Sequence, residues 1–120
     1  MASRGLFLMR KHDKVEMRLI NAKEHFEDVK AHIHFGTWFK EDGKDLVFPS
    51  PLDMTHSVSD HMKWFHSTLQ FDRKYIRQLE AAGLPMICRI RCYERSVTLE
   101  PEALLLGHQL HIQIKIEYVG

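Results

Sequence analysis

The sequence is poor in the residues that mark several special classes of protein. Its 120 residues include only two cysteines, four prolines and six glycines, which excludes a disulfide-rich scaffold, a collagen-like chain and a low-complexity segment. Cys88 and Cys92 stand four apart in a predicted strand, so their Cα atoms are roughly 13 Å apart, too far for a disulfide. We therefore expect two reduced, buried thiols, as is usual for a cytoplasmic protein.

Long apolar runs and an excess of one charge are also missing. The longest apolar stretches, 5–9 and 103–107, are far shorter than the roughly 20 residues that span a bilayer. Arg10 and Lys11 follow the first apolar stretch, whereas the basic residues of a signal peptide precede it. Seventeen Lys and Arg against sixteen Asp and Glu leave a net charge of +1, which attracts no polyanion over the whole surface. We expect a cytoplasmic protein with no membrane contact and no general affinity for nucleic acid.

The familiar enzyme signatures are absent too, since the chain has no HExxH, paired CxxC, GxSxG, P-loop or GxGxxG pattern. What it has in plenty is histidine, with nine in 120 residues. The 44% apolar and 28% charged composition is that of an ordinary globular protein. At this length we expect one domain covering residues 1–120.

Hydrophobic periodicity predicts an α+β fold, with helices packed on one face of a mostly antiparallel sheet. Period-two alternation predicts strands at 6–10, 14–20, 37–41, 45–48, 86–95 and 110–118. Helical spacing predicts helices at 22–34 and 58–82, the second long or broken, and a short one from Pro101 to Gly107. His12-Asp13 and Asp42-Gly43-Lys44 are the expected hairpin turns, and 49–57 is the longest expected loop. Asn21 with Glu24, and Ser57 or Ser59, are the expected helix caps.

The end of the chain, residues 84–120, has a distinctive order of elements. An alternating strand is followed by Leu99-Glu100-Pro101-Glu102-Ala103-Leu104, an L-x-P-E-x-L helix start, and then by a second alternating strand. This order resembles the C-terminal part of a group of small bacterial domains of unknown function, some of them immunity-protein-like. The resemblance covers under a third of the chain. It implies a binding domain of bacterial or phage origin, and it implies no catalytic residue.

Three residues of the first predicted helix are candidate metal ligands. His25, Asp28 and His32 fall within an arc of roughly 60° at 100° per residue. Imidazole and carboxylate groups in such a pattern suit zinc or another divalent metal. The same residues also fit the polar margin of a helix that buries Val29 and Ile33. The sequence favours the polar margin, so no cofactor is our first expectation and zinc the alternative.

Arginines form one row of the strand at 86–95. Arg89, Arg91 and Arg95 alternate with buried positions and flank Tyr93, a composition that an RNA-binding sheet face can use. The alternative is an exposed face whose arginines pair with carboxylates such as Glu117. One aromatic is fewer than a stacking platform usually presents, so ion pairing is favoured.

Adjacent aromatic residues suggest an interface. The two side chains of each adjacent pair, Trp38-Phe39 and Trp64-Phe65, cannot both point inward. Exposed Trp and Tyr side chains often anchor protein contacts. We therefore predict that Trp38, Phe39, Trp64 and Tyr75 contact a protein partner or a second copy of the chain, with Arg89 and Arg91 as a secondary surface. Enzyme and binding module both stay open, and the residues favour a protein-binding domain. A metal-binding protein or metal-dependent enzyme is second, and an RNA-binding sheet is third.

Overall fold

A computed structural model describes residues 13–33, 39–53, 55–93 and 97–119. The strands are β1 (Lys14–Leu19), β2 (Lys40–Asp42), β3 (Asp45–Pro49), β4 (Met86–Cys92) and β5 (Gln113–Tyr118). The α-helices are α2 (Phe26–His32), α3 (Val58–Leu69), α4 (Arg73–Ala81) and α5 (Leu105–Leu110). Three 3-10 turns precede helices: η1 (Lys23–His25), η2 (Gln70–Asp72) and η3 (Pro101–Leu104). The predicted α+β class is confirmed.

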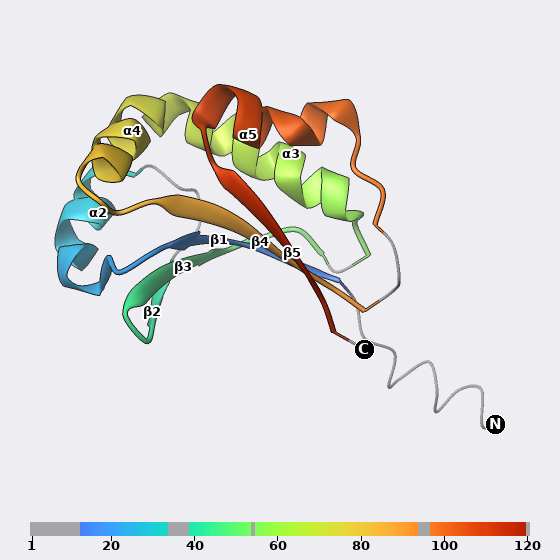
Figure 1. Ribbon diagram of the computed structural model, residues 1–120, viewed down its shortest axis with the longest axis horizontal. Helices are drawn as coiled ribbons and strands as arrows, with labels where there is room; N and C mark the ends of the chain where they lie inside the picture. Colours follow the sequence, from blue (N-terminus) through green and yellow to red (C-terminus); the bar gives the residue numbers. More distant parts are fainter. Residues whose placement is uncertain (1–12, 34–38, 54, 94–96, 120) are drawn as a thin grey trace.

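The described strands form one mixed sheet in the order β2-β3-β1-β4-β5. β1 pairs antiparallel with β3 and β4, and β2 pairs antiparallel with β3. β5 runs parallel to β4, because α5 carries the chain back across the sheet between them. Figure 1 shows α3, α4 and α5 above one face of the sheet, and no described helix on the other.

The core lies between that covered face and α3. Met17 and Leu19 of β1, and Cys88 and Ile90 of β4, alternate with polar residues and have no solvent exposure. Phe65 from α3 is equally buried against them. Full burial of one such side chain stabilises a fold by roughly 1.5–3 kcal/mol. The inner rows of the two central strands therefore decide which face the helices cover.

Two local predictions are confirmed. The β2–β3 hairpin turns through Gly43 and Lys44, and Gly43 has a φ of 62°, a left-handed conformation that costs glycine little. Ser57 precedes α3, and its Oγ accepts the N–H of Asp60 at 3.1 Å. The helical region 58–82 is broken, as one alternative expected, by η2 between α3 and α4.

Two helix boundaries were predicted wrongly. Asn21 does not cap a helix: it has a φ of 58°, and its N–H donates to Asp45 Oδ1 at 2.8 Å. A 3-10 turn then precedes α2, which ends at His32. The short helix after Pro101 continues past Gly107 to Leu110, because Leu106 and Leu110 are both buried in the core. The predicted strand at 6–10 and its turn at His12 lie outside the described residues.

Neither cysteine is in a disulfide, and both thiols are buried, as expected. Burial raises the pKa of Cys88 from 9.0 to about 12, and the nearby Glu16 carboxylate adds to the shift. A thiol with that pKa is protonated at neutral pH and is a poor nucleophile. Among the described helices, none has both the length and the apolar character to cross a membrane.

The Cys88 thiol should make the fold sensitive to alkali. Its folded pKa lies above the unfolded value near 9.0. The contribution of the buried thiol to the free energy of unfolding is therefore complete below pH 9 and is lost as pH rises toward 12. Urea titrations from pH 8 to 11 should show a steeper fall in the free energy of unfolding for the wild type than for Cys88→Ala. Equal slopes would contradict a buried, neutral thiol.

Candidate functional site

The uncovered face of the sheet carries a network of ion pairs. Arg18 on β1 donates to Asp45 at 2.8 Å and to Asp42 at 2.5 Å, and it also contacts Glu16. Burial alone would lower the pKa of Arg18, but these hydrogen bonds raise it above its usual value. The same guanidinium lowers the pKa of the Asp42 carboxyl. The network therefore ties the β2–β3 hairpin to the central strand.

The predicted arginine stripe belongs to the same network. Arg89 makes two hydrogen bonds to Glu117 on β5, at 3.1 and 2.9 Å, and its guanidinium lies 3.5 Å from Glu16. Arg91 is 3.8 Å from the same Glu117 carboxylate. Arg95 lies outside the described residues. The paired arrangement, which the sequence favoured over an RNA-binding face, is the one that the structure has.

The candidate metal ligands are split between two elements. Asp28 and His32 lie on α2, where His32 Nδ1 is 2.8 Å from the backbone oxygen of Asp28. Tyr75 on α4 donates its hydroxyl to Asp28 at 2.5 Å, and its ring stacks on His32 with centroids 4.6 Å apart. The pKa of Tyr75 is raised by burial and by this carboxylate. The cluster joins α2 to α4.

His25 is not part of the α-helix that carries Asp28 and His32. It lies in the 3-10 turn η1, whereas the predicted arc assumed one continuous α-helix. Within the described ranges, no group of three or more His, Cys, Asp and Glu side chains is placed to hold a metal ion. The metal site stays a prediction that this geometry does not strengthen.

The predicted aromatic contacts are more enclosed than the sequence suggested. Phe39 packs between Phe26 and Phe48, with ring centroids 4.8 Å apart in both cases. Trp64 is half-buried and packs edge-on against Phe65. Tyr75 is also half-buried, and Trp38 lies outside the described residues. Whether any of these side chains contacts a partner stays a prediction.

Among the described residues, the most exposed large apolar side chains are ones that the sequence analysis did not select. Phe71 in η2 is 82% exposed, and Tyr118, Val119 and Ile116 at the end of β5 are 58%, 40% and 38% exposed. Phe71 does not follow the helical spacing of the buried apolar residues in 58–82, so its exposure could have been predicted from the sequence. The β5 residues gave no such signal, because their alternation matched a buried row.

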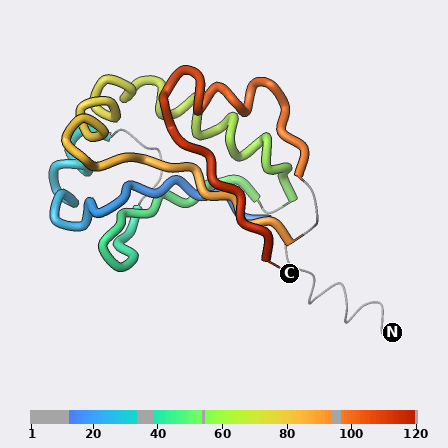
Figure 2. The backbone as a smooth tube through the Cα atoms, in the orientation of Figure 1, coloured from blue at the N-terminus to red at the C-terminus, as the bar shows by residue number. Residues whose placement is uncertain are grey.

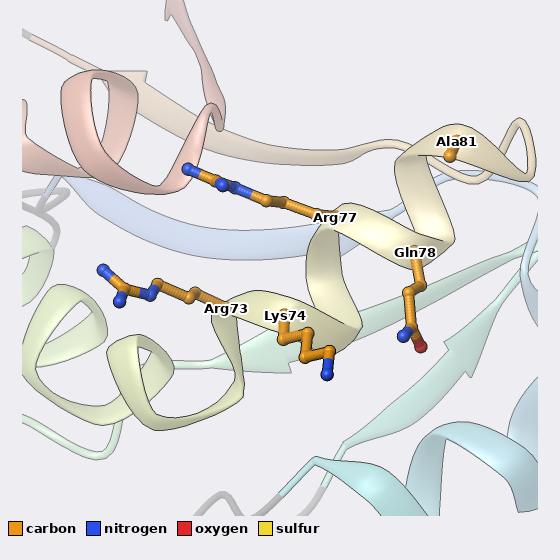
Figure 3. Close-up of a pocket in the computed structure, with 5 residues that line it drawn as sticks. All are labelled: Arg73, Lys74, Arg77, Gln78 and Ala81. Atoms are coloured by element: carbon orange, nitrogen blue, oxygen red, sulfur yellow. The ribbon is translucent and has the colours of Figure 1, made fainter.

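Three cations that have no carboxylate partner among the described residues follow Phe71 along α4. Arg73, Lys74 and Arg77 line a surface hollow of about 490 Å³ together with Gln78 and Ala81 (Figure 3). Arg73 and Arg77 extend from one side of α4, and Lys74 and Gln78 from another. A second hollow is lined by Arg77, Glu80 and Ala81 of α4 and by His111 after α5. Within the described part of the chain, these three cations have no carboxylate partner.

The half-buried Ser50 and the buried His61 meet below the loop that precedes α3. His61 is only 6% exposed, and its Nδ1 is 2.6 Å from Ser50 Oγ. Burial lowers the pKa of His61, and the nearby His56 lowers it further. Both residues border a cavity of about 310 Å³. Ser50 Oγ also accepts the N–H of Leu52, so we interpret the pair as a hydrogen-bonded anchor for this loop.

The His61 anchor should make the fold sensitive to acid. Because its folded pKa lies below the unfolded value of 6.5, its contribution is present above pH 6.5 and is lost as pH falls further. The melting temperature should drop less between pH 7 and pH 5 in His61→Gln than in the wild type. His108→Gln removes one imidazole at an exposed position and serves as the control. If the melting temperature of His61→Gln fell as much as that of the wild type, His61 would not be the acid-sensitive anchor.

Comparison with known proteins assigns no site to this chain. The resemblance of residues 84–120 to immunity-like bacterial domains stays a hypothesis. A role must be argued from the geometry described above, because no family model, no curated protein and no solved structure matches the chain.

Proposed function

We propose that this chain is a non-enzymatic protein-binding domain, of the inhibitor or immunity type, that recognises an acidic surface on its partner. The observation that carries the proposal is Phe71, which is 82% exposed and lies two residues before Arg73, the first residue of α4. Three cations of α4 have no carboxylate partner among the described residues and line a hollow. A bacterial or phage origin rests on the resemblance of residues 84–120 alone.

The charge pattern supports an acidic partner. The chain has a net charge of only +1, and on the sheet face Arg18 and Arg89 are bonded to carboxylates. Arg73, Lys74 and Arg77 differ, because within the described residues they lack such partners and line a hollow. Their charges are therefore available to a second molecule. Complementary charges speed association and select among partners.

Phe71 supports a protein rather than a small anion as that partner. A phenylalanine in water gains roughly 1.5–3 kcal/mol when it is fully buried, and aromatic and arginine side chains dominate many interfaces. Phe71 and Arg73 are two residues apart, so one partner can cover both. The combination fits an apolar pocket bordered by carboxylates.

The alternatives have less support from the described residues. Arg89 and Arg91 are engaged by Glu117, which makes them less available to RNA phosphates. Among the described residues, His25, Asp28 and His32 do not form a group placed to hold a metal ion. The predicted contacts Phe39 and Trp64 are half-buried against the core, so we move the proposed contact surface from them to Phe71 and α4.

The test is retention of partner proteins by immobilised variants. Wild type, Phe71→Ser and Arg73→Glu/Arg77→Glu are exposed to a nuclease-treated lysate of the cells that encode the chain, and the retained proteins are identified by mass spectrometry. We expect the same acidic protein to be held by the wild type and lost from both variants. Its retention should weaken as salt rises, because screening acts on exposed charges.

A charge-matched control separates the α4 surface from net charge. Lys40→Glu/Lys44→Glu makes the same change in net charge at two exposed positions of the β2–β3 hairpin and should retain the partner. Retention that is equal in wild type and both α4 variants would refute the proposal. Retention that is seen only with a parallel, untreated lysate would indicate nucleic acid instead.

A further inference from the structure

Among the described strands, β5 lies at one end of the sheet and leaves one edge open. Among the described strands it pairs only with β4. The N–H of Val119 donates to the backbone oxygen of Cys92 on β4 at 2.8 Å. Because the backbone groups of successive strand residues point to opposite edges, Ile114, Ile116 and Tyr118 direct their N–H and C=O groups to the open edge.

The side chains of the same three residues lie on the helix side of the sheet. In the parallel register, Ile114, Ile116 and Tyr118 stand beside Cys88, Ile90 and Cys92. Their partners on β4 are buried, yet Ile116 and Tyr118 are 38% and 58% exposed. Figures 1 and 2 show that β5 leaves the end of α5 and that its last part extends away from the helices. An apolar row therefore coincides, on one edge, with backbone groups that have no partner strand among the described residues.

We propose that β5 pairs antiparallel with β5 of a second copy, with Ile116 opposite Ile116 of that copy at the two-fold axis. This register places Ile114 opposite Tyr118. Every residue whose backbone N–H and C=O point to the open edge then stands opposite a residue of the same kind. Each opposed pair exchanges two backbone hydrogen bonds, and the sheet continues across both chains. In a register shifted by one residue, backbone groups that point to the second copy would stand opposite groups that point to β4, and the hydrogen bonds could not form.

The charges on the other face select the same register. Lys115 and Glu117 lie on the uncovered face, in register with Arg89 and Arg91. With Ile116 on the axis, Lys115 of each chain stands opposite Glu117 of the other, in the closely spaced kind of pair. The strand Gln-Ile-Lys-Ile-Glu-Tyr is thus complementary to itself in backbone, apolar row and charge. A partner strand with charges of only one sign could pair with Lys115 or with Glu117, but not with both.

The experiment is sedimentation equilibrium of the full chain over a wide concentration range. We expect an average mass that rises with concentration to twice the 14.2 kDa of one chain. Lys115→Glu sets two like-charged pairs across the axis and should weaken the dimer about tenfold or more. The substitution should not harm the monomer, because the new carboxylate would stand beside Arg89 in the parallel register.

Two further variants keep the result decisive. Lys40→Glu makes the same charge change on β2, at the opposite edge of the sheet, and should leave the dimer unchanged. Ile116→Lys places two ammonium groups at the axis and should give a monomer with the wild-type circular dichroism spectrum. A wild type that stays monomeric, or a dimer that neither β5 variant weakens, overturns the proposal.

Discussion

The one-sided burial of the sheet is the constraint on which the rest of the structure depends. Met17 and Leu19 on β1, together with Cys88 and Ile90 on β4, can leave water only if helices cover that face. α3 supplies the cover with Phe65 and its neighbours. The opposite face then has to be compatible with water, and the ion pairs around Arg18 and Arg89 meet that need.

The same constraint explains where the two proposed surfaces lie. A helical layer over one face has an outer side. The part formed by η2 and α4 carries Phe71 and three cations that have no carboxylate partner among the described residues. The sheet also has edges, and β5 extends beyond the helices, so that Ile114 packs against the core while Ile116 is partly exposed. Natural edge strands usually carry charges or twists that prevent association. The Lys115 and Glu117 pair instead restricts association to one register and one orientation.

Periodicity was enough to predict the central part of this fold. β4 and the hairpin around Gly43 follow from alternation and from one turn pair, and Ser57 was readable as a cap. Asn21 was misread because its N–H bonds to Asp45, 24 residues away, and no local pattern reports such a contact. His25 was misplaced since a 3-10 turn has a different angular repeat from an α-helix.

The candidate surfaces were harder to predict for a physical reason. Alternation tells which side of a strand is apolar, and it does not tell whether another element covers that side. Ile116 and Tyr118 therefore looked like core, while Phe39 and Trp64 looked exposed and are half-buried. The pairing of Arg89 with Glu117 was foreseeable because both residues lie on predicted strands and carry opposite charges.

Residue-resolved amide exchange in β5 tests most directly that this edge is open in one chain and closed by a second. The account predicts that the amides of Lys115, Glu117 and Val119, which face β4, are protected at every protein concentration. The amides of Ile114, Ile116 and Tyr118 should exchange rapidly in dilute solution and become protected as concentration rises. Protection of the second set in dilute monomer, or rapid exchange at all concentrations, would contradict the account.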